Sequence, residues 1–314
     1  MTVTERLRVI ERLRAGMARG VLSFPLTSFA DDGALDLPAY RDYLASRIAA
    51  GPGALFPACG TGEFFSLDED EYGRVIRAAV EVADGRLPVV AGVGYGWAQA
   101  ARFARIAEDA GADAALLMPH YLVKAPQDGL VAQVREVASR TRLPLIAYQR
   151  DQVTFTADSV RRIAEIPGVI GLKDGHGDLD RLQRGKLAAP DGFLFFNGAA
   201  TAELQARAYA SLGVTAYSSA VHAFAPEIAR AFFTALGAHD DTTVEKLLTG
   251  FYIPFVELRD RVPGYAVSLV KAAARLRGLP VGPVRAPLTD PSPADLTDLA
   301  ALLERGLDLV GATR

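Results

Sequence analysis

The feature that most constrains the fold is a series of eight short apolar runs, separated by stretches with helical spacing. Within each run the apolar residues are continuous rather than alternating, which is typical of parallel strands buried on both faces. A hydrophobic content of 50% over 314 residues is ample to cover such a sheet. The predicted strands are Val21–Phe24, Ala54–Pro57, Pro88–Val93, Ala114–Met118, Leu145–Tyr148, Val169–Lys173, Phe193–Asn197 and Val214–Ser218.

The stretches between the runs predict amphipathic helices. Over Ala98–Ala110, for example, Phe103, Ile106 and Ala107 share one helical face. The other predicted helices of this kind are Leu37–Ala50, Asp68–Ala83, Gln127–Arg140, Ala157–Glu165, Leu179–Ala188, Ala200–Leu212 and Pro226–Leu236.

Eight strand–helix units predict an α/β fold, a (β/α)8 TIM barrel, which occupies residues 1–238 together with an N-terminal helix. A doubly wound open sheet shares this periodicity and is the alternative. After Leu236 the strands stop, and three helical stretches predict a C-terminal helical extension over residues 239–314. These stretches are Thr242–Arg261, Tyr265–Leu276 and Ser292–Leu307.

Composition narrows the partners and the compartment. The formal net charge of −3 lacks the basic excess expected for binding nucleic acid or a membrane surface. The charged N-terminal segment argues against a signal peptide, and no uncharged apolar run approaches the ~18 residues of a membrane span. Cys59 is the single cysteine, so no intrachain disulfide forms. We expect a soluble, cytoplasmic protein.

Lys173 is the leading catalytic candidate because it ends the sixth predicted strand, where barrel enzymes place their active sites. Its strand neighbours Ile170, Gly171 and Leu172 are uncharged, and desolvation can lower a lysine pKa to about 7–8. A neutral amine attacks ketones to give iminium adducts. The alternatives are a lysine that extends to solvent or one that pairs with Asp174.

Two further strand ends carry polar candidates. Tyr148 ends strand five and can relay protons, although a core tyrosine with a satisfied hydroxyl is the commoner case. Arg150 can bind a substrate carboxylate or pair with Asp151.

After strand two, the segment Gly60-Thr61-Gly62 offers backbone N–H groups and a hydroxyl to an anion. The alternative is a tight turn before a helix, with Ser66 as its N-cap.

No cofactor or metal is expected from the sequence. The glycines of Gly92–Gly96 lack the spacing of a dinucleotide-binding loop. The four histidines form no ligand pair with metal-binding spacing.

Taken in this order, the motifs resemble the dihydrodipicolinate synthase / N-acetylneuraminate lyase superfamily, whose members are class I aldolase-type barrels. The likeness runs from about Gly20 to Leu276. The superfamily's G-T-T-G-E loop appears as Cys59–Glu63, with Gly60 in place of the first Thr. Its strand-five Tyr matches Tyr148, and its Schiff-base Lys matches Lys173 within Gly171–Asp178.

Departures from the superfamily pattern indicate the branch. Gln149-Arg150-Asp151 replaces the usual Asn and Pro after the tyrosine, and Val153 stands where synthases carry an arginine. The sequence is most similar to the 5-dehydro-4-deoxyglucarate dehydratase branch, although Ala223 replaces an asparagine usual there. The stretches that favour this branch are Gly62–Leu67, Tyr148–Asp151, Asn197–Glu203 and Tyr217–Ala220.

The resemblance implies a small keto-acid substrate, a six-carbon diacid, and a decarboxylating dehydration that gives 2,5-dioxopentanoate, CO2 and water. Lys173 would form the Schiff base and Tyr148 would move protons. The implied substrate-binding residues are Gly60, Thr61 and Gly62 for the keto-acid carboxylate, Arg150, Ser218 and Ser219 for the second carboxylate, and also Asn197 and Tyr121.

In relatives, the counterpart of Tyr121 reaches into a neighbouring subunit's site, so a homo-oligomer, a dimer or a tetramer, is expected.

Three other functions stay open at this point. A pyruvate-dependent aldolase or synthase of the same superfamily would use the same lysine. A non-catalytic barrel could bind keto acids as a sensor. A metal-dependent barrel enzyme would need ligands at the strand ends, where the sequence has no such cluster.

Overall fold

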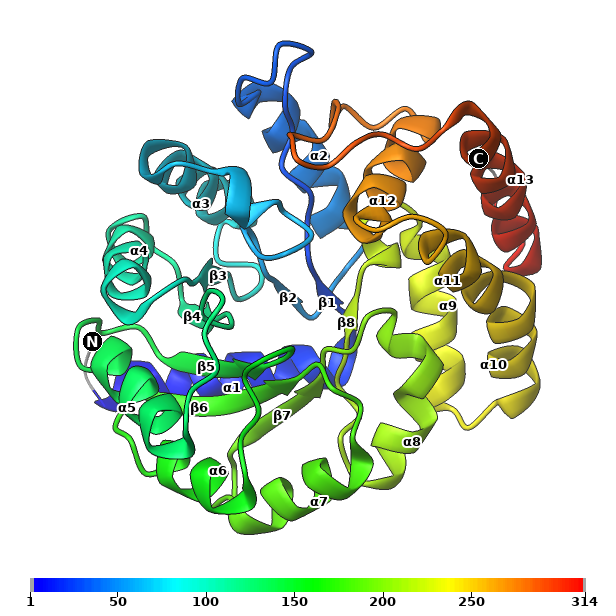
Figure 1. Cartoon of the computed structure of the whole chain (residues 1–314). Coiled ribbons are helices and arrows are strands. Elements are labelled where there is room, and N and C mark those ends of the chain that lie inside the picture. Colours follow the sequence, from blue (N-terminus) through cyan, green and yellow to red (C-terminus); the bar gives the residue numbers. More distant parts are fainter. Residues whose placement is uncertain (1–2, 313–314) are drawn as a thin grey trace.

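The computed structural model describes residues 3–312, and over these residues it is an α/β barrel with eight parallel strands inside a ring of helices (Figure 1). All eight predicted strands are present, seven of them close to the predicted positions. The eighth is displaced, because it begins at Ser218 rather than Val214. The strands are β1 (Leu22–Ser23), β2 (Ala54–Leu55), β3 (Val90–Val93), β4 (Ala114–Leu117), β5 (Leu145–Gln149), β6 (Val169–Asp174), β7 (Leu194–Asn197) and β8 (Ser218–Ser219).

Strand order excludes the doubly wound alternative. Strands β3, β4, β5, β6 and β7 are hydrogen-bonded to one another in sequence order. In the second group, β1 lies between β2 and β8 and pairs with both. Parallel bridges at Leu55–Val89 and Asn197–Tyr217 join these two groups, so the sheet closes on itself. Closure leaves no free sheet edge and confirms the predicted barrel.

The barrel interior is filled by apolar side chains from successive strands, among them Phe24, Ile146 and Phe196. Helix α1 (Val3–Arg19) adds Val9, Leu13 and Met17 to the same cluster. A Cβ on Gly16 of α1 would overlap the backbone of Gly53 just before β2, so the helix lies against the N-terminal ends of the strands. The opposite, C-terminal ends are therefore the ones that open to a ligand.

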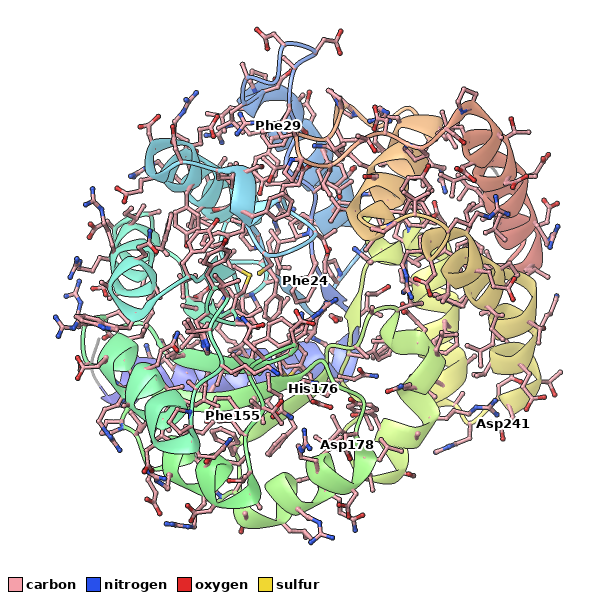
Figure 2. All side chains as sticks on the ribbon, in the orientation of Figure 1. Phe24, Phe29, Phe155, His176, Asp178 and Asp241 are labelled. Carbon is pink, nitrogen blue, oxygen red and sulfur yellow. The ribbon has the colours of Figure 1, made fainter. Side chains whose placement is uncertain are left out.

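The helices that follow the strands form the outer ring. Figure 2 shows Phe24 near the centre of the ring and Asp241 at its periphery. Asp68, not Ser66, is the N-cap of α3, where it shares a capping box with Glu71. The helices are α2 (Leu37–Ala49), α3 (Glu69–Ala83), α4 (Trp97–Asp109), α5 (Gln127–Ala138), α6 (Ala157–Ala164), α7 (Leu179–Ala188), α8 (Ala206–Ser211) and α9 (Pro226–Gly237), with short 3-10 turns η1 (Phe64–Ser66), η2 (Ala202–Gln205) and η3 (Val221–Ala223).

Two predicted helices are divided in the structure. The stretch 200–212 forms the turn η2 and then α8, and the stretch 242–261 forms α10 (Asp241–Leu247), a π-helical turn η4 (Leu248–Tyr252) and α11 (Ile253–Arg259). Helical periodicity does not reveal these changes, because a single altered turn leaves the apolar spacing nearly intact.

The C-terminal helices pack into the same hydrophobic core as the helices that surround the barrel. Phe255 of α11, Leu269 of α12 (Tyr265–Leu276) and Leu303 of α13 (Pro293–Leu309) belong to the same buried cluster as residues of α2 and α3. In Figure 1, α11, α12 and α13 lie together on one side of the barrel. Across residues 3–312, none of the helices combines the length and apolar character that crossing a membrane would require.

Candidate active site

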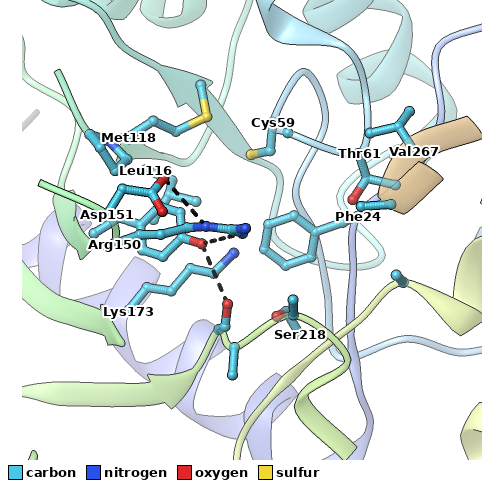
Figure 3. Close-up of a pocket in the computed structure, with 18 of the residues that line it drawn as sticks. Phe24, Cys59, Thr61, Leu116, Met118, Arg150, Asp151, Lys173, Ser218 and Val267 are labelled. Atoms are coloured by element: carbon cyan, nitrogen blue, oxygen red, sulfur yellow. Dashed lines mark hydrogen bonds and ion pairs between the residues drawn. The ribbon is translucent and has the colours of Figure 1, made fainter. Parts of the chain in front are cut away.

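A cavity of about 660 Å³ opens at the C-terminal ends of the strands (Figure 3). Its walls come from the barrel loops and from α11 and α12, which contribute Phe255, Arg259 and Val267. Seven of the ten predicted site residues line it: Gly60, Thr61, Tyr121, Tyr148, Arg150, Lys173 and Ser218.

Lys173 faces the barrel interior because β6 is irregular. Ile170 already points into the interior cluster, so strict alternation would turn Lys173, three residues on, to the outside. The pairing of β5 with β6 shifts by one residue between Leu145 and Ile146. The shift places Lys173 level with Tyr148 on β5 and Phe196 on β7.

The Lys173 ammonium lies among aromatic rings. Its Nζ is 4.0 Å from the ring centre of Phe24 and 4.3 Å from that of Tyr148, and the residue is 6% exposed. Gly198, directly after β7, makes room for the side chain, since a Cβ there would overlap Lys173 Cε and stand 2.9 Å from Cδ.

Burial without a counter-ion favours the neutral form of the Lys173 amine. Among residues 3–312, no carboxylate forms a salt bridge with it. Desolvation lowers the pKa of Lys173 to about 7; the Cys59 thiol opposes this shift, and Arg150 adds to it. Asp174 is buried on another face, where Gln149 Nε2 donates to it over 2.8 Å. Both alternatives, a solvent-exposed lysine and a Lys173–Asp174 pair, are therefore wrong.

Tyr148 and Arg150 stand beside this amine. The Tyr148 hydroxyl donates to the Gly198 carbonyl and accepts from Arg150 Nη1, each over 3.4 Å. Arg150 Nε is also 3.6 Å from Asp151. Burial raises the pKa of Tyr148, and Arg150 partly offsets this. The raised pKa favours the protonated form of the Tyr148 hydroxyl.

The loop after β2 presents Gly60 and Thr61 to the cavity. Gly60 is exposed, a Cβ there would meet nothing within 4 Å, and Thr61 is half-buried beside it. Gly62 lies deeper, outside the cavity lining, and its carbonyl accepts a hydrogen bond of 2.7 Å from Thr27. Gly60 and Thr61 can meet a ligand, whereas Gly62 shapes the turn.

A buried ion pair fixes this loop from below. Glu63 has a left-handed backbone (φ 55°). Its carboxylate accepts a hydrogen bond of 2.6 Å from Lys271 Nζ of α12 and one of 2.9 Å from the backbone N–H of Arg285. Both side chains of the Glu63–Lys271 pair are completely buried. Desolvation lowers the pKa of Lys271 to about 8, and the Glu63 carboxylate opposes that shift.

Two other predicted binding residues also lie outside the cavity lining. Asn197 is fully buried and holds the following turn, since its side chain donates to the Ala202 carbonyl and accepts from the Ala199 N–H. Ser219 donates to the buried carboxyl of Glu203 over 2.6 Å. Ser218 does line the cavity, and its hydroxyl donates to the Asn197 carbonyl over 3.3 Å. These contacts give Asn197 and Ser219 a part in supporting the wall.

Tyr121 lies at the cavity mouth, on the loop between β4 and α5. It is 71% exposed, and its neighbours Leu122 and Val123 are exposed as well. Tyr121 and Leu122 line the cavity, while the rest of this apolar loop tip faces outward. The loop thus presents apolar surface beside the site.

The cavity also contains residues that were not predicted from the sequence, among them Phe24, Gly198, Thr201 and Arg259. Phe24 and Gly198 stand at or just after predicted strand ends, a position that could have marked them. Arg259 gave no such signal, because it reaches the cavity from a helix far along the chain. In the described part of the chain, no three His, Cys, Asp or Glu side chains gather closely enough to hold a metal ion.

Comparison with known families agrees with this geometry. The sequence model of the dihydrodipicolinate synthetase family matches residues 17–305, nearly the whole chain. The chain belongs to this family. Among solved structures, the dihydrodipicolinate synthase of Bacillus clausii is similar with a TM-score of 0.84 and 27% identity, covering 93% of this chain and 98% of that one. That of Oceanobacillus iheyensis has a TM-score of 0.83 and 25% identity, over 93% and 98% of the two chains.

Curated members of the family are far more similar in sequence. A protein of Streptomyces avermitilis is 77% identical over 304 residues, which is 97% of this chain and 92% of that one. A protein of Streptomyces coelicolor is 75% identical over 309 residues, 98% and 96% of the two chains. Both are named "Probable 5-dehydro-4-deoxyglucarate dehydratase 2".

Proposed function

We propose that this chain converts 5-dehydro-4-deoxyglucarate into 2,5-dioxopentanoate, CO2 and water through a Schiff base on Lys173. The observation that carries the proposal is an unpaired, buried amine at the mouth of a family barrel, level with Tyr148 and beside a polar loop. The substrate is taken from the names of the Streptomyces relatives, which match this chain almost from end to end.

The chemistry begins with the neutral amine. Lys173 Nζ adds to the C5 ketone, and the carbinolamine loses water to give an iminium. Tyr148 supplies and recovers the protons of these steps, because its hydroxyl lies between Arg150 and the Gly198 carbonyl. The iminium acidifies C4–H, and the enamine that forms expels the C3 hydroxyl as water. Loss of CO2 and hydrolysis of the imine then free the product and regenerate the lysine.

The two ends of the substrate need different partners. In our proposal Thr61 and the backbone of Gly60 hold the carboxylate next to the ketone, since both face the cavity. The Glu63–Lys271 pair keeps that loop in place. Arg150 and Ser218 also line the cavity.

We further propose a homo-oligomer, a dimer or a tetramer, in which the exposed loop tip of Tyr121, Leu122 and Val123 packs against a neighbouring subunit at the cavity mouth. Light scattering on the wild type and a Tyr121→Ser, Leu122→Ser variant tests it: a shift toward monomer is expected, and unchanged mass would contradict it.

For location we propose the cytoplasm, because the buried Cys59 is a free thiol, as in reducing compartments.

The deciding experiment is incubation with 5-dehydro-4-deoxyglucarate, followed by assay for CO2 and 2,5-dioxopentanoate. Formation of pyruvate without CO2 would instead identify an aldolase of the same family. Borohydride added during turnover should leave a mass adduct on the peptide that contains Lys173. Ligand binding with neither product nor adduct would identify a non-catalytic keto-acid-binding barrel, and full activity in EDTA is expected.

A further inference from the structure

We infer that Arg259, held by Thr201, binds the second carboxylate of the substrate and so selects keto diacids over keto monoacids. The inference rests on the proposed function for the identity of the reaction, but its test does not need turnover. Arg259 lies at the C-terminal end of α11, in the helical part of the chain.

The surroundings of Arg259 are those of an anion site. Its side chain is 14% exposed, and it shares the cavity wall with Phe255, Val267 and Val270. Nη1 donates to the Thr201 hydroxyl over 2.8 Å. Apolar neighbours reduce the dielectric around the guanidinium, which strengthens its attraction for a carboxylate. Arginine suits this role because its planar fork can donate two parallel hydrogen bonds to one carboxylate.

The existing partner of Arg259 does not block the site. Nε and Nη2 donate to Asp260 over 2.7 and 3.0 Å, so that edge of the guanidinium is engaged. Asp260 is 60% exposed and is not part of the cavity lining. Of the five guanidinium N–H groups, two donate to Asp260 and one to Thr201, so one on Nη1 and one on Nη2 are left to donate to a ligand carboxylate.

Thr201 carries an independent sign of a built site. Its backbone is left-handed (φ 56°), a conformation that β-branched residues rarely adopt. Strained residues of this kind gather at ligand sites, where the surrounding structure holds them. Here the strain brings the hydroxyl to Arg259.

Lys173 and Arg259 line the same cavity and are connected by one short piece of the loop after β7. Gly198 touches Lys173 and Tyr148, and Thr201 touches Arg259. Three residues of chain span at most about 11 Å. Gly198 and Thr201 are therefore close together on the cavity wall, and in our inference one extended diacid bound to Lys173 lies along this stretch toward Arg259.

Arg150, the cation that the sequence offered for this carboxylate, lies elsewhere. It donates to the Tyr148 hydroxyl, and Figure 3 shows its side chain reaching toward the space between Lys173 and Phe24. Its charge also contributes to the lowered pKa of Lys173. Arg150 therefore belongs to the reacting end of the cavity, which leaves Arg259 for the other end.

The test compares two keto acids of equal length, 2-oxoadipate and 2-oxohexanoate, which differ only in the second carboxylate. Each forms an imine with Lys173 by loss of water, and borohydride supplies the hydride that reduces it to a stable amine. The readout is the keto-acid concentration that gives half-maximal labelling of Lys173 by mass spectrometry. The wild type should prefer 2-oxoadipate by at least about 10-fold.

In Arg259→Gln this preference should fall to near parity, with labelling by 2-oxohexanoate unchanged. Arg259→Lys should keep part of the preference, and the matched control Arg261→Gln, which alters an arginine paired with Asp295 and Asp298 on the surface, should keep all of it. The inference would be overturned if Arg259→Gln kept the wild-type preference for 2-oxoadipate. It would also be overturned if only Arg150→Gln lost that preference.

Two further measurements keep the inference separate from the proposed function. Thermal unfolding of each variant shows that it is folded. Calorimetric binding of the same two acids to Lys173→Ala measures the carboxylate preference with no covalent step. Absence of labelling in the wild type would refute Schiff-base catalysis, whereas loss of the calorimetric preference in Lys173→Ala, Arg259→Gln would still support Arg259.

Discussion

Lys173 and Lys271 are both buried lysines, and they differ in what stands opposite the ammonium. Lys173 has aromatic rings around it and no salt bridge within residues 3–312, while Lys271 has the Glu63 carboxylate at 2.6 Å. Desolvation lowers the pKa of both, to about 7 and about 8. The comparison teaches that burial favours the neutral form of both amines, and that a buried carboxylate opposes this shift and holds Lys271 in an ion pair.

The largest expected difference between the two lysines is in catalysis. Lys173→Met should lower kcat by at least about 10³-fold, because it removes the nucleophile. Lys271→Met should keep borohydride labelling of Lys173 by pyruvate, measured at a temperature where the variant is folded. Turnover by Lys173→Met at more than a few per cent of the wild-type rate would contradict the assignment.

The next effect is on stability. Lys271→Met should destabilise the fold by about 3–5 kcal/mol, because it leaves the Glu63 carboxylate buried without its partner. Urea unfolding measures the change. The double variant Glu63→Gln, Lys271→Met should regain part of the loss, since an amide is cheaper to bury than a lone charge. Equal stability of the single and double variants would mean that the pair is not coupled.

A third prediction concerns the space around Lys173. Gly198→Ala should lower kcat by about 10²-fold, because the added methyl overlaps Lys173 Cε and must displace the amine. The melting temperature should fall as well, because the methyl would also stand 2.5 Å from Lys173 Cγ, which is close to the backbone of β6 and cannot move freely. The control is Gly237→Ala, where a Cβ meets nothing within 4 Å. Wild-type kcat in Gly198→Ala would show that the lysine tolerates another position.

The smallest expected effect is that of Lys173→Met on stability, and it is a gain, whereas Lys271→Met lowers stability. Lys173 is protonated up to about pH 10.5 in the unfolded chain but only to about pH 7 in the folded protein, so its contribution to stability rises with pH between these values. Lys173→Met should therefore stabilise the fold at pH 6 by about 1 kcal/mol or more, and less at pH 9. Denaturation at both pH values measures this, and a loss of stability at pH 6 would contradict unpaired burial.

The sequence predicted the barrel and the Schiff-base candidate because both are local signals. The apolar runs mark buried strands, and Lys173 and Tyr148 stand at the ends of two of them. The strand shift that turns Lys173 inward left no sequence pattern of its own. Contacts made at long range, such as Arg259 with Thr201, depend on packing that no local pattern encodes.

Asn197 and Ser219 illustrate another limit. Their residue types suit a polar ligand, yet in the structure they hold the loop after β7 and the carboxyl of Glu203. Successive side chains of a strand point to opposite faces, so two neighbouring residues can differ in whether the side chain faces the cavity or packs behind its wall. Ser218 and Ser219 differ by that one step.

The most direct test of the central claim is the pH dependence of the Lys173 amine. The rate of pyruvate labelling with a reductant, followed on the Lys173 peptide between pH 5 and pH 11, reports the fraction of neutral amine. The structure predicts a rise with a midpoint near pH 7, because burial lowers the pKa to about 7. A midpoint near 10, the value of an exposed lysine, would contradict the account.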